Sequence, residues 1–275
     1  MVDFHMHSIL SDGTDDIDTL LEKTKNLEYF SITDHDSIDS ATYIMNNGLN
    51  TPNYVTGVEL STKDMGDSVH ILFYNYNPDN KVLKEVIKEI DNVRIRRLEE
   101  RLDILKNDFD IKFDKADLDY LYSLENPTKP NIASVLIRNN YAVSVDEAIK
   151  VFLNHRLKST KLESTYVLNK LKDEEGILVL AHSLGGIGEK RIDKEKVIDR
   201  INRFKECGLK GLECIYSLYD NEEQQFLLDI AKKNKLIITG GSDYHGKNKK
   251  VKIAELSKDD NTNYKYINLM NYIKK

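Results

Sequence analysis

Short apolar runs alternate with polar, helix-like segments over the first and last parts of the chain. Seven of these runs are brief and rich in β-branched and aromatic residues, which favours strands over helices. They span residues 2–4, 29–32, 54–58, 69–73, 177–181, 211–215 and 236–239. Apolar positions spaced by about 3.6 residues predict helices between them, most clearly at 17–27, 197–207 and 222–233. The alternation predicts an α/β fold with a mostly parallel sheet, either open or closed into a barrel.

The strand pattern stops in the middle of the chain. Residues 80–107 predict one long charged helix, with Val86, Ile90 and Leu98 on its apolar side. Shorter helical patterns follow at 116–124, 131–139 and 145–153. We therefore expect an α/β domain made of residues 1–77 and 166–275, interrupted by an all-helical insertion at residues 78–165.

Composition and charge narrow the class of protein. The 275 residues are 40% hydrophobic and 31% charged, as in ordinary globular proteins. The sequence shows neither the roughly 18 consecutive apolar residues of a membrane helix nor a signal peptide. Its cysteines, Cys207 and Cys214, are too few for a disulfide framework, so we expect a cytoplasmic protein. The net charge of −6 predicts no membrane partner and no stable long nucleic-acid partner.

Histidines and carboxylates lie near the ends of the predicted strands. His5 and His7 are two residues apart, so on a strand they project to the same side and can bind one metal ion. Asp12 follows in a turn just beyond. Taken alone, this pair of histidines is better explained as solvated residues near the start of the chain.

The second and third predicted strands also end in ionisable residues. Asp34, His35 and Asp36 follow one strand, and an exposed acidic turn that caps the next helix would also explain them. Glu59 interrupts an apolar run, and a strand edge facing water is its ordinary explanation. A carboxylate can nevertheless bridge two cations, so Glu59 suits a site with several metal ions.

The later strands add His70, His182, Asp243 and His245, with Glu213 as a weaker candidate for orienting a ligand. Six of the seven histidines lie in or just after predicted strands; His155 is expected on the surface of the insertion. The carboxyl ends of strands are where parallel α/β proteins form active sites. About nine nitrogen and oxygen donors, without cysteine, exceed the four ligands of a structural zinc site and suit a catalytic cluster of two or three ions of Mn, Fe or Zn.

The ordered set of motifs resembles the PHP family, the polymerase and histidinol phosphatase phosphoesterases. The resemblance runs from residue 1 to about residue 247 and rests on His-Met-His-Ser with Ser-Asp-Gly, Thr-Asp-His-Asp, Gly-Val-Glu, His70, Ala-His-Ser and Gly-Ser-Asp-Tyr-His-Gly. It implies a distorted (β/α)7 barrel, in agreement with the seven predicted strands.

The resemblance also implies three metal positions. The first ion would be held by His5, His7, Glu59 and Asp243, and the second by Asp12, His35 and His245. Glu59 would bridge to a third ion, completed by His70 and His182. Asp34 and Asp36 would orient histidines or transfer protons, and with His182 they are the expected catalytic residues.

The helical insertion is similar to that of stand-alone family members that hydrolyse nucleoside mono- and bisphosphates or trim short RNA from its 5′ end. In those proteins it caps the metal site and carries an Arg-Pro-His segment that helps to bind phosphate. This chain has Lys129-Pro130-Asn131 instead; lysine keeps the charge without the bidentate fork, and asparagine cannot titrate. Arg94 and Arg97 of the long helix, with Lys129 and Asn131, are the expected substrate-binding residues, although a solvated helix face would also explain the arginines.

The expected activity is metal-dependent hydrolysis of a small phosphate ester by a hydroxide that bridges two ions. The expected substrate is a nucleoside mono- or bisphosphate or a short 5′-phosphorylated oligonucleotide. A histidinol-phosphate phosphatase of the same fold and a metal-binding module without turnover are alternatives. A metal-dependent amidohydrolase also begins with His-x-His on a barrel strand, but it would normally use a lysine bridge where this chain has Glu59.

Overall fold

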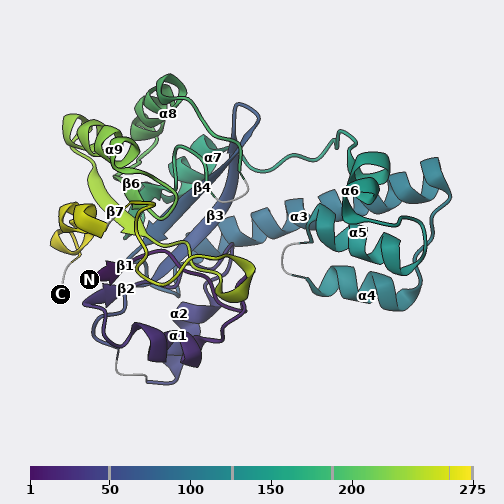
Figure 1. The fold of residues 1–275 in the computed structure, drawn as a ribbon, viewed down its shortest axis with the longest axis horizontal. Coiled ribbons are helices and arrows are strands. Elements are labelled where there is room, and N and C mark those ends of the chain that lie inside the picture. Colours follow the sequence, from purple (N-terminus) through teal and green to yellow (C-terminus); the bar gives the residue numbers. More distant parts are fainter. Residues whose placement is uncertain (49–50, 125–126, 187–188, 260, 274–275) are drawn as a thin grey trace. The chain divides into compact units, whose positions relative to one another are not determined.

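The computed structural model describes residues 1–48, 51–124, 127–186, 189–259 and 261–273. The chain forms two compact units, which are described separately (Figure 1). The larger unit comprises Met1–Ile87 and Leu162–Lys275, and the smaller unit comprises Lys88–Lys161. The first boundary therefore falls inside the long helix α3 (Lys81–Phe109).

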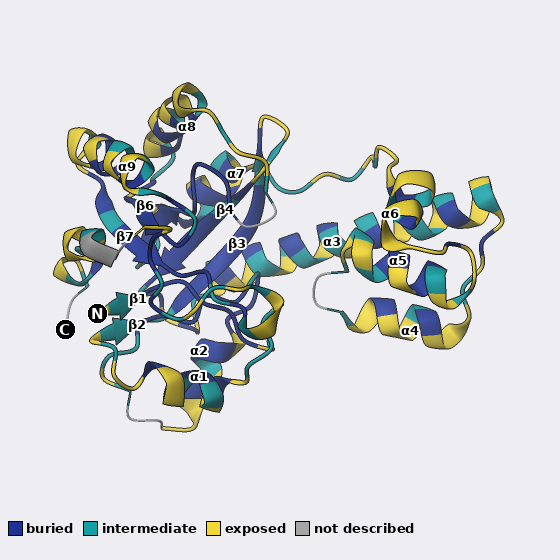
Figure 2. Cartoon of the chain, in the orientation of Figure 1, coloured by how far each residue is buried: buried dark blue, intermediate teal, exposed yellow. Residues whose placement is uncertain are grey.

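The larger unit is a mixed α/β structure, as the sequence predicted. Strands β1 (Val2–Asp3) and β2 (Tyr29–Phe30) form a parallel pair. The second sheet has the order β3-β4-β5-β6-β7. Its strands are β3 (Gly57–Asp64), β4 (Asp67–Tyr74), β5 (Ile177–Leu180), β6 (Gly211–Tyr216) and β7 (Ile237–Gly241). Figure 2 shows that these strands are mostly buried.

The sheet is less parallel than the sequence predicted. Strands β5, β6 and β7 are parallel, but β4 is antiparallel to both β3 and β5. Met65 and Gly66 both have positive φ, at 49° and 91°, which suits a two-residue hairpin turn between β3 and β4. The prediction that the third strand spans residues 54–58 was wrong, because β3 continues through Glu59–Asp64, whose polar side chains lie inside the protein rather than in a loop.

Isolated β-bridges and a backbone hydrogen bond connect the two sheets. Met6, which follows β1, forms a β-bridge with Tyr244, which follows β7, and His35, which follows β2, forms one with Glu59 of β3. The amide of Asp243 also donates to the carbonyl of His5 at 2.8 Å. The backbones approach so closely here that a Cβ on Gly241 would lie 2.2 Å from His5 Cβ. These contacts bring residues from both ends of the chain to one edge of the strands.

Helices pack around the strands of the larger unit (Figure 1). They are α1 (Ile17–Thr24), α2 (Asp39–Asn46), α7 (Ser164–Leu171), α8 (Lys194–Glu206) and α9 (Asn221–Asn234). Short 3-10 segments follow at Gly246–Asn248, Asn261–Tyr266 and Leu269–Asn271. Helix α8 buries Val197, Ile201 and Phe204 at helical spacing, and α9 begins with a capping box of Asp220 and Glu223. Helices α1, α8 and α9 lie where the hydrophobic spacing predicted them.

The smaller unit contains most of α3, followed by α4 (Lys115–Ser123), α5 (Lys129–Arg138), α6 (Val145–Ala148) and a π-helical turn at Ile149–Leu153. Its own core includes Leu98, Leu105, Leu121, Ile132 and Leu136. In the described parts of the chain, none of the helices combines the length and the hydrophobicity that crossing a membrane requires.

Candidate metal centre

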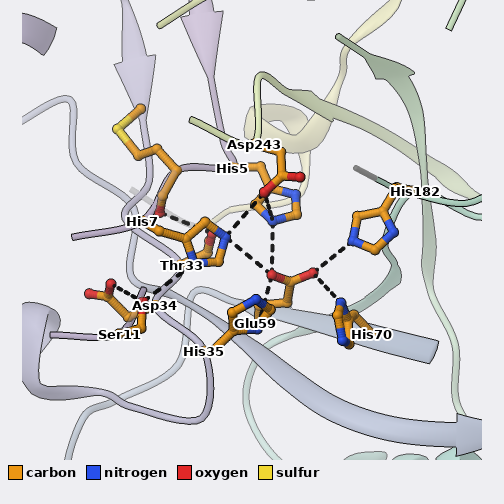
Figure 3. A network of polar contacts seen from close by, with 12 residues as sticks. His5, His7, Ser11, Thr33, Asp34, His35, Glu59, His70, His182 and Asp243 are labelled. Carbon is orange, nitrogen blue, oxygen red and sulfur yellow. Dashed lines mark hydrogen bonds and ion pairs between the residues drawn. The ribbon is translucent and has the colours of Figure 1, made fainter. Parts of the chain in front are cut away.

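Glu59 lies at the centre of a cluster of histidines in the larger unit (Figure 3). Its side chain is 1% exposed. Both of its carboxylate oxygens contact histidine nitrogens. Oε2 lies 3.1 Å from His5 Nε2, 3.2 Å from His7 Nε2 and 3.3 Å from His35 Nδ1, and Oε1 lies 2.9 Å from His182 Nε2 and 3.1 Å from His70 Nδ1. One carboxylate therefore joins two groups of imidazoles, which is the geometry of a bridging metal ligand.

The hairpin explains how Glu59 and His70 come together. In the antiparallel register, Glu59 lies opposite Leu72, and Ser61 lies opposite His70. Residues at such diagonal positions on one sheet face can touch when their side chains are long. Glu59 lies inside β3 and not at a strand end as the sequence predicted, because the sequence analysis did not recognise the turn at Met65 and Gly66. His70 lies within β4, in the fourth strand where the sequence placed it.

Two aspartates extend the cluster around His7. Asp243 Oδ1 lies 3.4 Å from His7 Nε2, and Asp12 Oδ1 lies 3.6 Å from His7 Nδ1. Asp12 also lies 3.0 Å from His245 Nε2 and 3.9 Å from His35 Nε2. Two groups with metal-ligand spacing result: His5, His7, Glu59 and Asp243, and His7, Asp12, His35 and His245. They match the first two sets implied by the resemblance, except that His7 also belongs to the second.

A third group contains a residue that the sequence analysis missed. His70, His182 and Glu189 offer donor atoms within 4.8 Å of one another. Glu189 Oε2 accepts from the Gly186 amide at 2.8 Å and lies 3.1 Å from His182 Nδ1. Its Oε1 lies 3.7 Å from His70 Nδ1. The glycine-rich segment after β5 was the available signal, since such a segment can fold a nearby side chain back toward a strand end.

The histidines fit metal ions because several of their buried donor atoms form no regular hydrogen bond. Among the described residues, the buried nitrogens without a hydrogen-bond partner include His7 Nε2, His35 Nδ1, His70 Nδ1 and His245 Nε2. Each of these nitrogens lies 3.0–3.3 Å from a carboxylate oxygen without forming a regular hydrogen bond, so cations bound between the two kinds of donor would complete their pairing. Divalent ions of Mn, Fe or Zn suit this mixture of imidazole and carboxylate donors.

The pKa values of the cluster also favour bound cations. Burial lowers the pKa of His7, but Asp243 and Glu59 more than compensate and raise it to about 9. Burial raises the pKa of Glu59, yet His5, His35 and His70 hold that pKa well below its usual range. Burial also lowers the pKa of His35 well below its usual range, against the opposing effect of Glu59. The carboxylates thus stay ionised, and protons on histidines supply part of the positive charge that bound cations would supply.

Further residues hold the ligands in place. Glu213 lies 2.8 Å from His5 Nδ1 and accepts from the amide of His182 at 2.7 Å. Asp243 Oδ2 accepts from Tyr216 at 2.7 Å and from Lys249 at 2.8 Å. Carboxylates that bind the far nitrogen of a ligand histidine fix its ring and raise its basicity. Glu213 was a weaker candidate from sequence, whereas Tyr216 and Lys249 were missed because nothing in their spacing relates them to Asp243.

Asp34 and Asp36 lie beside the cluster and accept hydrogen bonds from serine residues. Asp34 accepts from the Ser8 amide and from the hydroxyls of Ser8 and Ser11 at 2.7–2.8 Å. The Ser11 hydroxyl is in turn 3.5 Å from His7 Nδ1. Asp36 has a positive φ of 53° and accepts from the Ser61 amide at 2.7 Å. Asp34 therefore reaches a histidine through Ser11, and Asp36 anchors the strand that carries Glu59.

The predicted substrate-binding residues all lie in the smaller unit, where each has a local contact. Arg94 pairs with Asp91 at 2.6 Å, and Arg97 donates to the Ser159 carbonyl at 2.7 Å. Lys129 lies 3.4 Å from Asn154 Oδ1. Asn131 accepts from the Thr128 amide as part of the capping box of α5. Asn131 thus has a structural task at the start of α5.

Comparisons with known proteins find relatives over nearly the whole chain, although no family model matches it. It is 24% identical over 256 residues to a phosphoribosyl 1,2-cyclic phosphate 1,2-diphosphodiesterase of Eggerthella lenta, covering 89% of this chain and 94% of that protein. It is 23% identical over 259 residues to a 5′-3′ exoribonuclease of Haemophilus influenzae, covering 88% and 89% respectively.

Solved structures show a similar fold. One from Bifidobacterium adolescentis, named as a candidate metal-dependent phosphoesterase, is 27% identical with a TM-score of 0.69, covering 94% of this chain and 93% of that chain. An amidohydrolase from Chromobacterium violaceum has the same TM-score of 0.69 at 18% identity, over 91% of this chain and 89% of that chain. The latter likeness concerns the fold alone.

Proposed function

We propose that this chain, a metal-dependent phosphoesterase of the PHP type, hydrolyses the phosphate ester of a small phosphorylated ribose compound. The enzyme class and the family resemblance predicted from the motifs are confirmed by the likenesses described above. The observation that carries the proposed site is the position of Glu59, whose two oxygens face separate groups of histidines.

The centre would hold three divalent ions. The first would bind His5, His7, Glu59 and Asp243, the second His7, Asp12, His35 and His245, and the third Glu59, His70, His182 and Glu189. When bound, such ions supply an activated water and neutralise the charge of the phosphoryl group. In the hydrolysis, a water oxygen forms a bond to phosphorus while the ester P–O bond breaks. The alcohol leaves with a proton that comes from the water; a monoester then yields inorganic phosphate, and a diester yields a phosphomonoester.

The residues of this chain would contribute orientation and charge. Glu213 holds the rings of His5 and, through the backbone, the position of His182. Asp34 fixes Ser11, which lies beside His7. Lys249 and Tyr216 fix Asp243 through its outer oxygen, so that the inner oxygen faces the histidines. Ligands locked in this way need little rearrangement when the phosphate ester binds.

The two sheets would be parts of one distorted (β/α)7 barrel. The bridges Met6–Tyr244, Phe30–Tyr54 and His35–Glu59 support this proposal, since they lie where β1 would meet β7 and β2 would meet β3. A closed barrel would account for donors from residue 5 to residue 245 converging at one end of the strands.

A cluster of cations in the smaller unit supports a phosphorylated substrate. Burial and the charge of Arg97 lower the pKa of Arg101 to about 10. Burial, Arg101 and Arg97 likewise lower the pKa of Lys129. Within the described residues, Arg101 Nε is also buried without a hydrogen-bond partner. Like charges held together at this cost would be relieved by an anion such as phosphate bound within the smaller unit.

The names of the two relatives narrow the substrate class. One acts on a phosphoribosyl cyclic phosphate and the other is a ribonuclease, so both concern phosphorylated ribose. The test follows the hydrolysis products, both inorganic phosphate and phosphomonoesters, by chromatography, with metal-stripped protein reloaded with Mn²⁺. The panel comprises adenosine monophosphate, a 3′,5′-bisphosphate, a 5′-phosphorylated RNA dinucleotide, a ribose cyclic phosphate and histidinol phosphate.

We expect turnover of at least one ribose compound, and its loss in His7→Ala and Asp243→Ala. His155→Ala is the matched control, because His155 is exposed and lies in the smaller unit, with its ring tilted against that of Phe109. Turnover of histidinol phosphate alone would replace the proposed substrate. Bound metal with no turnover of any compound would indicate a metal-binding module without activity.

A further inference from the structure

A second cavity adjoins the metal centre in the larger unit. The centre itself opens into a cavity of about 170 Å³, lined by its candidate ligands and Lys249. A larger cavity of about 510 Å³ begins at the same wall, because His70, His182 and Glu189 line both. An ester whose phosphorus lies among the ions could therefore extend directly into the larger cavity, which we call the side pocket.

The side pocket is lined by a mixture of apolar and hydroxyl groups. Leu180 and Ile192 form part of its apolar wall. Ser183, which also lines it, is 3% exposed, and its hydroxyl is among the buried atoms that have no hydrogen-bond partner within the described structure. A buried hydroxyl without a partner is costly, so it points to a ligand or water that completes its hydrogen bonds.

The buried cation in the pocket wall, Arg200, is already neutralised, and the other charged lining residues are Asp67, Glu189 and the exposed Lys190. Arg200 is 2% exposed and lines the pocket, but its guanidinium donates to Asp64 at 2.9 Å and to Asp67 at 3.0 Å. A second phosphate would thus find a guanidinium that two carboxylates occupy. The chemistry favours an uncharged group with hydroxyls and an apolar face.

We propose that the side pocket binds the leaving-group half of the substrate, an uncharged, hydroxylated group of nucleoside size. This inference rests on the proposed function, because it assumes that phosphorus lies among the metal ions. The volume is in the range of pockets that hold small organic ligands, roughly 300–1,000 Å³. The proposal explains why the pocket begins at the His70, His182 and Glu189 wall and why a hydroxyl is left unpaired inside it.

The test fills the pocket and compares a large with a small leaving group. Ile192→Trp adds bulk to a half-buried lining residue. Its matched control is Ile198→Trp, the same change at a residue that is 40% exposed on α8. We expect Ile192→Trp to raise KM for adenosine 5′-monophosphate at least about tenfold, with kcat/KM for methyl phosphate within about twofold of the wild-type value. The control should change neither.

Ser183→Ala removes only the hydroxyl and leaves the pocket volume nearly unchanged. It therefore tests the pocket even if Ile192→Trp does not fold. It should raise KM for adenosine monophosphate about threefold or more and leave methyl phosphate unaffected. Equal losses on both esters, or no change with adenosine monophosphate, would overturn the proposal. If the wild-type protein hydrolyses no ribose compound of the panel, the proposed function fails, and calorimetric binding of adenosine then tests the pocket by itself. Binding that Ile192→Trp removes supports the pocket, and undiminished or absent binding refutes it.

Discussion

Two clusters of buried charge lie on the same β3–β4 hairpin, and they differ in how completely their polar atoms are paired. Next to the turn, Asp64 accepts from Arg200 Nε at 2.9 Å and from both terminal nitrogens of Arg203, at 2.7 and 2.9 Å. Farther along β3, Glu59 lies 2.9–3.3 Å from nitrogens of five histidines, and three of these nitrogens, on His7, His35 and His70, form no hydrogen bond within the described residues. A fully paired cluster stabilises the fold, whereas an unsatisfied one is prepared for a ligand.

The largest effect should come from Glu59, because it touches both groups of histidines. Glu59→Gln keeps the shape of the side chain but replaces a charged oxygen by an amide group that cannot bridge cations. We expect the variant to lose at least two bound ions per chain by elemental analysis and to fall about 1,000-fold or more in kcat/KM. Full metal content with normal turnover would show that Glu59 is an ordinary buried partner of histidines.

A substitution of Asp64, next to the turn, should lower the stability of the fold without changing catalysis. Asp64→Asn leaves Arg200 buried without its full charge partner, which costs about 3 kcal/mol in the free energy of unfolding. Urea unfolding of the metal-stripped proteins measures this cost separately from metal binding. The metal content and kcat of the folded variant should match the wild type; a variant as stable as the wild type would contradict the assignment of Asp64 to the fold.

A smaller effect should follow from weakening the support of the ligands. Glu213→Gln keeps a hydrogen-bond acceptor near His5 but removes the charge that raises the basicity of that ring. We expect the affinity for Mn²⁺ to fall about 10- to 100-fold, as measured by competition with a chelator. Glu206→Gln, at the end of α8, changes an exposed glutamate and serves as the control. Equal affinities of the two variants would remove Glu213 from the centre.

The smallest effect is the pH dependence of the Asp64 contribution. Burial raises the pKa of Asp64, but hydrogen bonds from Arg203 and Arg200 outweigh it and hold the pKa below its unfolded value. A depressed carboxylate pKa stabilises the folded protein above the unfolded pKa of about 4, and this stabilisation is lost as the pH falls through the folded pKa. The difference in unfolding free energy between wild type and Asp64→Asn should therefore shrink from pH 7 to pH 3, and a constant difference would exclude this cause.

Much of the fold was predictable because local patterns carry it. The spacing of apolar residues located α1, α8, α9 and α3, and brief β-branched runs located most strands. The end of the third strand was not predicted, because the six residues Glu59–Asp64, five of which are buried, continue it without a distinctive period. The hairpin turn was not predicted either, because Met65 is an unusual residue for a turn position that requires positive φ.

The sequence by itself determined which chemistry is available: histidines and carboxylates at the right strands, in an order that resembles one family of phosphoesterases. Residue type and position along an element are local properties, so they can be read from the chain. Only the tertiary structure decided which donors meet, because contacts such as His5–Glu213, His182–Glu189 and Asp243–Lys249 depend on strand register and on how loops fold back. Those properties are set by packing across the whole unit, and no short stretch of sequence encodes them.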